Sequence, residues 1–86
     1  MKKIICHIEL WDIYQHPILL ENGQITELPE CPLEQLDEML AEYCKKYNTN
    51  QIALYGARAF NDKLAHDIYE YSATQYGINN LEIEVV

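Results

Sequence analysis

The sequence is short of basic residues. Five lysines and one arginine stand against fourteen acidic residues, so the formal net charge is −8 at pH 7. A surface of this charge repels nucleic acid phosphates and anionic lipid, and it favours basic partners. The chain also lacks any apolar run near the ~20 residues of a transmembrane helix. Its acid-flanked start, without a clear cleavage site, predicts a strand rather than a signal peptide. We therefore expect a cytoplasmic protein.

The chain contains only three cysteines. Cys6, Cys31 and Cys44 are odd in number and far apart, and they form no C-x-x-C motif. This spacing argues against a disulfide framework and a zinc site, and it predicts reduced thiols packed in the interior. Cys31 has one alternative, because it precedes Pro32 at an expected helix start, where the pKa of a thiol can be lowered. We expect neither a metal nor a cofactor.

What the sequence does contain is typical of one globular domain over residues 1–86. Hydrophobic residues make up 49% of the chain and charged residues 23%. Apolar patterning predicts strands over residues 2–10, 13–20, 24–28, 51–55 and 81–86. Asn22-Gly23 predicts a two-residue hairpin turn between the second and third strands, and Pro17 places that hairpin toward the sheet edge.

Two amphipathic helices are expected. Pro32 stands at the first position of the earlier helix. Its predicted inward face carries Leu33, Leu36, Leu40, Tyr43, Cys44 and Tyr47. The later helix ends at Gly77. Its predicted inward face carries Phe60, Leu64, Ile68 and Tyr71. We expect contact between the helices through Leu36, Leu40, Leu64 and Ile68, on one face of the sheet.

The resulting order, β-β-β-α-β-α-β, predicts an α+β fold: a two-layer α/β arrangement with a mixed five-stranded sheet and two helices on one face. Right-handed crossovers favour the strand order 3-2-1-4-5, with strands 1, 4 and 5 parallel. This order resembles the core of the ribonuclease H-like fold. The stretches "QIALYGARAFNDKLAHDI" and "LEIEVV" resemble small uncharacterised proteins of bacteriophages, a resemblance that implies no function.

Enzymatic chemistry is not expected. The ribonuclease H-like resemblance implies metal-binding carboxylates on the first and fourth strands. Glu9 suits the first position, but the fourth strand ends in Leu54-Tyr55-Gly56 and has no acid. The histidines are scattered, and the single serine, Ser72, lies far along the later helix without an activating partner.

One ligand site is considered where the fourth strand joins the later helix, at "GAR", residues 56–58. In open α/β sheets, ligands bind beyond the carboxyl ends of parallel strands. The predicted topology gathers four residues at that edge: Trp11, Asp12, Tyr55 and Arg58. A lone glycine does not make a phosphate loop. The favoured interpretation is therefore a connection, in which Gly56 permits a sharp turn and Arg58 pairs with Asp12 or a nearby glutamate.

The outward faces of both helices are acidic. The residues that we assign to a partner-binding surface are Glu34, Asp37, Glu38, Glu42, Asp62, Asp67, Tyr69 and Glu70. Exposed acids at this density mimic the field of a nucleic acid and would attract a basic protein surface. Tyr69 would add contact area. Two alternatives stay open: the acids only keep the protein soluble, and the tyrosines pack on the sheet rim.

These patterns favour a non-enzymatic protein–protein interaction module. A phage-encoded inhibitor of a host nucleic-acid-binding protein fits both the charge and the phage resemblance, and it would act in the host cytoplasm. A structural or assembly subunit of a phage fits almost as well. The remaining alternative is a ligand-binding or degenerate ribonuclease H-like module that uses the strand-end crevice.

Overall fold

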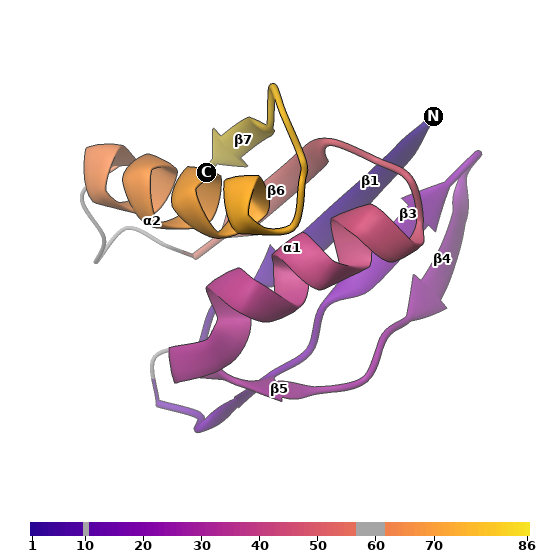
Figure 1. Ribbon diagram of the computed structural model, residues 1–86. Coiled ribbons are helices and arrows are strands. Elements are labelled where there is room, and N and C mark those ends of the chain that lie inside the picture. The colour runs from indigo at the N-terminus through magenta and orange to yellow at the C-terminus, as the bar shows by residue number, and fades with distance from the viewer. Residues whose placement is uncertain (10, 57–61) are drawn as a thin grey trace.

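The computed structural model describes residues 1–9, 11–56 and 62–86, with only the backbone described for residues 62–65. Within these residues, a five-stranded mixed sheet carries two helices on one face (Figure 1). The strands are β1 (Lys2–His7), β3 (Ile18–Glu21), β4 (Gln24–Glu27), β6 (Gln51–Tyr55) and β7 (Glu82–Val85), in the order β4-β3-β1-β6-β7. β6 is parallel to both β1 and β7, whereas β3 is antiparallel to β1 and β4. The predicted fold class and strand order are confirmed.

The segment between β1 and β3 differs from the prediction. It contains β2 (Tyr14–Gln15), which pairs with β5 (Cys31–Pro32) in a separate two-stranded sheet. The predicted strand over residues 13–20 is therefore divided, and Pro17, which has no N–H for a strand ladder, lies at the division. The first helical segment follows β5 as a 3₁₀ turn, η1 (Leu33–Gln35), and continues as α1 (Leu36–Lys46). Pro32 has ψ 145° and so precedes the helix instead of occupying its first position.

The hairpin between β3 and β4 turns at the predicted dipeptide. Asn22 has φ 51° and Gly23 has φ 81°. Positive φ at both central residues is the geometry of the two-residue turn that matches the twist of the flanking strands, and asparagine and glycine adopt it at the lowest cost. The turn sets the register, in which Leu20 lies opposite Ile25.

The core lies between the sheet and the two helices. On the sheet side, Ile4, Cys6 and Leu54 are fully buried. On the helix side, α1 buries Leu36 and Leu40 completely. The remaining residues of the predicted α1 face, Leu33, Tyr43, Cys44 and Tyr47, are buried or pack against this cluster. The predicted inward face of α1 is confirmed, and each of its buried leucines contributes roughly 1.5–3 kcal/mol of hydrophobic free energy.

The inward face of α2 (Asp62–Gln75) was predicted wrongly. Ile68 is substantially exposed and Tyr71 is 66% exposed, whereas Tyr69, Ser72 and Ala73 are buried. The side chains of Phe60 and Leu64 lie outside the described residues. The small side chains of Ser72 and Ala73 allow α2 to approach α1 closely, which explains the rotation of the helix away from the predicted face.

The cysteines lie in the interior, as predicted. Cys6, Cys31 and Cys44 are buried free thiols. Burial, together with nearby Cys31, raises the pKa of the Cys6 thiol to about 12, and burial raises that of Cys44 to about 11. Burial also raises the pKa of Cys31. The alternative of a lowered pKa at Cys31 is therefore wrong, because this residue lies in β5, before the helix, and is shielded from water.

The second face of the sheet carries no helix in the part of the chain that the structure describes (Figure 1). Ile5 is half-buried on this face, and an ion pair between Lys3 Nζ and Glu84 Oε2, 3.4 Å apart, joins β1 to β7 across β6. Because both side chains are partly exposed, this pair contributes little to stability. None of the helices in the described residues has the length and apolar character needed to cross a membrane.

Candidate interaction sites

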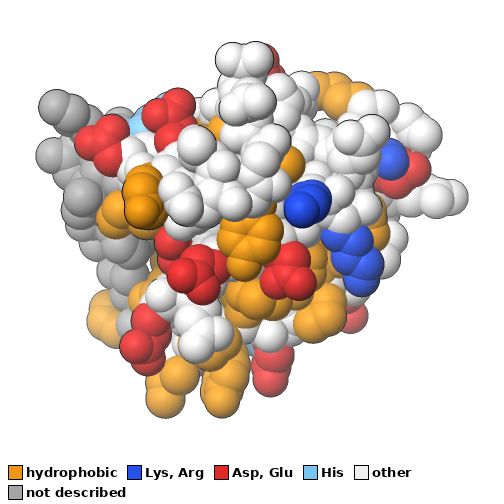
Figure 2. All heavy atoms as spheres, viewed as in Figure 1, with side chains coloured by type: hydrophobic (Ala, Val, Ile, Leu, Met, Phe, Trp, Pro, Cys, Tyr) orange, Lys and Arg blue, Asp and Glu red, His pale blue; other side chains and the backbone are white. Residues whose placement is uncertain are grey.

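The outward side of the two helices carries most of the predicted partner-binding residues. We define the acidic helical face by its exposed described carboxylates: Glu34, Glu38, Glu42, Asp67 and Glu70. Figure 2 shows acidic side chains distributed over this side of the molecule, with hydrophobic side chains between them. Among the side chains that the structure describes, no lysine or arginine forms an ion pair with any of these five carboxylates. The side chain of Asp62 lies outside the described residues.

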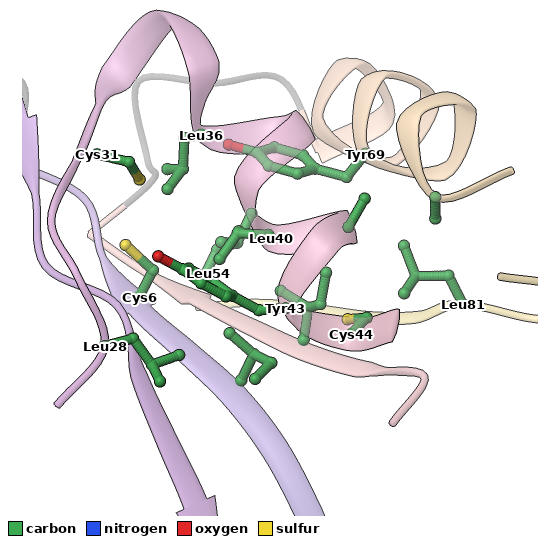
Figure 3. Packing of buried hydrophobic residues seen from close by; sticks show 14 of the residues in the cluster. Cys6, Leu28, Cys31, Leu36, Leu40, Tyr43, Cys44, Leu54, Tyr69 and Leu81 are labelled. Carbon is green, nitrogen blue, oxygen red and sulfur yellow. The ribbon is translucent and has the colours of Figure 1, made fainter. Parts of the chain in front are cut away.

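Two predicted contact residues lie inside the molecule instead. Tyr69 is only 9% exposed and is directed from α2 into the core beside Leu36 and Leu40 (Figure 3). Burial, followed by the charge of Asp37, raises the pKa of the Tyr69 hydroxyl. Asp37 is half-buried and accepts a hydrogen bond from Ser72 Oγ. The prediction that Tyr69 is an exposed contact residue is wrong, and Asp37 serves the contact between α1 and α2.

Two exposed apolar residues on α2 could serve the contact role that was predicted for Tyr69. Tyr71 and Ile68 project outward from the same helix as Asp67 and Glu70. A tyrosine supplies a large rigid apolar area with a polar end, which is the kind of group that protein interfaces use. The alternation of tyrosines along α2 gave no signal that could separate the inward tyrosine from the outward one.

The predicted strand-end crevice is only partly assembled. Trp11 and Asp12 line a common cavity of about 430 Å³, which lies on the side of β2 and β5. Its lining residues are Trp11, Asp12, Ile13, Tyr14, His16 and Glu30. Tyr55 does not line this cavity, and Arg58 lies outside the described residues. The predicted pairing of Arg58 with Asp12 therefore stays a prediction.

Gly56 has a structural explanation at the end of β6. Its φ is 73°, and a Cβ atom there would lie 3.0 Å from the carbonyl oxygen of Ile8 and 3.1 Å from the imidazole of His7. The side chain of any larger residue would clash with the backbone that leaves β1. The residue would also have to adopt an unfavourable left-handed conformation. This agrees with the interpretation of Gly56 as a residue that a sharp turn requires.

A buried glutamine holds the segment after β1 in place, a role that the residue pattern does not predict. Gln15 is 1% exposed, and its side-chain amide binds the backbone of Glu9 and Asp12. A buried glutamine satisfies these backbone groups while the neighbouring side chains Trp11, Ile13 and Tyr14 project into solvent. The only sequence signal is the polar Gln15 inside an otherwise apolar stretch, which was read as part of a continuous strand.

Catalytic groups are not brought together in the described residues. No group of three or more histidines, cysteines and acids is placed to hold a metal ion there. His7 Nε2 lies 3.8 Å from Glu9 Oε1, and His16 Nδ1 lies 3.8 Å from Glu30 Oε2, but all four side chains are largely exposed. The hydroxyl of Ser72 is buried and donates to Asp37. The two histidines thus lie near acids at the surface, and Ser72 joins α2 to α1.

Comparison with known proteins identifies no family for the chain. No family model matches it, and no curated protein does. Among solved structures, it is similar to the Aquifex aeolicus member of the Ppx/GppA protein family, with a TM-score of 0.41 and 12% sequence identity. The match covers 100% of this chain and 35% of that one, so the chain spans about a third of the length of that protein.

Proposed function

We propose that the chain is a non-enzymatic protein–protein interaction module that binds a basic protein surface through its acidic helical face. The observation that carries the proposal is the combination of five exposed carboxylates with two exposed apolar side chains, Ile68 and Tyr71, on the outward side of α1 and α2. Carboxylates alone would suit solubility, whereas apolar groups beside them also suit a contact surface.

The two kinds of residue would act on different steps of binding. Exposed carboxylates create a negative field that accelerates encounter with a basic partner, and this effect weakens as salt concentration rises. Tyr71 would be desolvated only in the complex, so its contribution would fall mainly on dissociation. It replaces Tyr69 in this role, because Tyr69 is already buried in the core.

The nature of the partner follows from the charge and from the phage resemblance. A dense acidic surface competes with nucleic acid for a basic groove, which favours a phage-encoded inhibitor of a host nucleic-acid-binding protein, acting in the host cytoplasm. A phage structural or assembly subunit remains the alternative outcome. It would be indicated if the captured partner were another phage protein.

The test is capture of partners from a bacterial lysate on the immobilised chain. Glu38→Lys with Glu42→Lys reverses two charges on the acidic helical face, and Glu27→Lys with Glu82→Lys makes the same change in net charge on exposed strand residues. The first variant should lose the captured protein and the second should retain it. Equal losses would mean that net charge alone matters and that no helical binding surface exists.

Surface plasmon resonance on the captured partner then separates the two roles. The Glu38→Lys, Glu42→Lys variant should slow association and weaken its dependence on salt, and Tyr71→Ala should mainly speed dissociation. If association is indifferent to both salt and the charge reversal, the acids act only as a solubilising surface.

The enzymatic alternative has its own test. The fourth strand of the sheet order, β6, has no carboxylate, so we predict that Mg²⁺ or Mn²⁺ with RNA or DNA leaves the nucleic acid intact. Calorimetry should detect no binding of either ion tighter than roughly millimolar. Cleavage that disappears in Glu9→Gln would replace the proposal with a degenerate ribonuclease H-like activity.

A further inference from the structure

The segment after β1 exposes a cluster of large apolar side chains. We call residues 11–14 the Trp11 loop. Trp11 is 90% exposed, Ile13 is 72% exposed and Tyr14 is 50% exposed. Single exposed apolar residues are ordinary on protein surfaces, but several together mark an interaction site. In Figure 2, hydrophobic side chains project at the lower edge of the molecule, where this segment runs in Figure 1.

The loop is held by hydrogen bonds. Gln15 Oε1 accepts from the Glu9 N–H at 2.8 Å, and Gln15 Nε2 donates to the carbonyls of Glu9 and Asp12 at 2.9 and 3.0 Å. The Asp12 N–H donates to the Glu9 carbonyl at 3.2 Å, and the Leu33 N–H donates to the Ile13 carbonyl at 2.9 Å. These bonds fix the backbone that presents the apolar side chains, which reduces the entropy that a partner's binding would cost.

The cavity beside the loop has the chemistry of a cation site. Trp11 and Tyr14 contribute aromatic rings, and Asp12 and Glu30 contribute carboxylates. No lysine or arginine lines this cavity of the described structure. Aromatic faces attract cations, most strongly that of tryptophan, and a guanidinium both stacks on rings and pairs with carboxylates. His16 Nδ1 lies 3.8 Å from Glu30 Oε2, and both side chains are largely exposed.

We propose that the Trp11 loop and its cavity bind an arginine side chain presented by a segment of a partner protein. Arginine matches the paired aromatic and carboxylate groups better than lysine does, because its planar guanidinium contacts both at once. A protein segment rather than a small cation is the occupant, since only a larger surface would cover Trp11 and Ile13 together. No residue that lines this cavity belongs to the acidic helical face, so this site stands apart from the proposed function.

The protein contains one tryptophan, so its fluorescence reports directly on this site. The probe is a short glycine–serine peptide that contains arginine, titrated beside matched peptides with lysine or neutral citrulline at the same positions. The arginine peptide should change the Trp11 emission in a saturable manner. The lysine peptide should bind more weakly than the arginine peptide. The affinity of the citrulline peptide should be lower than that of the arginine peptide by about fivefold or more.

Two double variants with equal charge changes locate the binding. Asp12→Asn with Glu30→Gln should weaken binding of the arginine peptide by about fivefold or more, whereas Glu27→Gln with Glu82→Gln, at exposed strand residues, should leave its affinity within about twofold. Trp11→Ala, followed by calorimetry in place of fluorescence, should also weaken binding. All five substitutions in these three variants lie at exposed positions, so circular dichroism should confirm an unchanged fold.

Several results would overturn this proposal. Equal binding of the citrulline and arginine peptides would exclude a guanidinium site, and equal weakening by both double variants would indicate a general effect of charge. Free arginine that binds as tightly as the peptide would indicate a small-cation site. A dimer in sedimentation experiments that dissociates in Trp11→Ala would show that a second copy of the chain occupies the loop.

Discussion

The two helices lie over the same face of the sheet, but they enter the core with different kinds of side chain. α1 contributes Leu36 and Leu40, both completely buried. α2 buries Tyr69 beside the small residues Ser72 and Ala73, and it leaves Tyr71 in solvent. The apolar area of α1 is thus used inside the protein, whereas part of the apolar area of α2 remains available outside.

The difference distinguishes the buried side chains of α1, which stabilise the fold, from the exposed side chains of α2, which we propose contact a partner. A helix that has buried its large aliphatic residues presents mainly charge on its outer side, as α1 does with Glu38 and Glu42. A helix that packs through small residues leaves its larger apolar side chains in solvent. These side chains then contribute no hydrophobic free energy to folding. The exposed tyrosine of α2 is consistent with a contact surface for a partner.

The largest expected effect concerns the α1 side of the comparison. Leu40→Ala should reduce the free energy of unfolding by roughly 2–5 kcal/mol, because it removes a fully buried side chain and leaves a cavity. Ile68→Ala on α2 should reduce it by less than about 1 kcal/mol, since Ile68 is substantially exposed. Urea unfolding measures both. Similar losses for the two variants would contradict the division between the helices.

A second effect comes from buried groups that titrate at high pH. Burial raises the pKa of Cys44 on α1 from its ordinary value of 9.0 to about 11. Below pH 9 both the folded and the unfolded chains hold this proton. Above pH 9 the unfolded chain loses it first, so stability should fall as pH rises toward 11, by up to about 1.4 kcal/mol per pH unit.

Cys44→Ala should make this alkaline loss of stability shallower, even if the variant is less stable at neutral pH. Tyr69→Phe on α2 provides the matched test, because burial also raises the pKa of Tyr69. Urea unfolding over the alkaline range would measure the slopes. A slope that neither substitution changes would show that these groups are accessible to water in the folded protein.

The contact between the helices should have a smaller effect. Ser72→Ala removes the hydroxyl that donates to Asp37 and should cost roughly 1–2 kcal/mol. Thr74→Ala on the same helix is the control, because the Thr74 hydroxyl is exposed and binds only the Glu70 carbonyl. A double-mutant cycle with Asp37→Asn isolates the pair. Strict additivity in that cycle would show that the two side chains do not interact.

The smallest expected change in stability belongs to the outward tyrosine. Tyr71→Ala should alter the free energy of unfolding by no more than about 0.5 kcal/mol, since its side chain is 66% exposed. Its effect should appear instead as faster dissociation from a basic partner. If Tyr71→Ala destabilises the protein as strongly as Leu40→Ala, the tyrosine belongs to the core and not to a contact surface.

Most of the sheet and one helix could be predicted from residue patterns. Alternation defined β1 and β7, Asn22-Gly23 defined the hairpin, and the handedness of crossovers then left one strand order. The inward face of α1 was equally clear, because its leucines form a single stripe. α2 offers two competing stripes, and an amphipathic pattern alone cannot choose between them.

Other features depend on contacts between distant segments. Tyr69 faces inward because Ser72 meets Asp37 of α1, 35 positions earlier in the chain. The Trp11 loop projects outward because Gln15 binds Glu9 and Asp12 while β2 pairs with β5. Neither the partner of a buried polar group nor the separate two-stranded sheet can be read from local periodicity.

The sequence by itself determined the class of fold, the strand order and the acidic character of the surface, because these follow from local periodicity, turn chemistry and a sum of charges. Tertiary structure alone decided which tyrosine of α2 is buried and where an aromatic loop lines a cavity with two carboxylates. These choices were settled by close packing and by the need to pair every buried polar group, and both conditions apply only once distant segments are brought together.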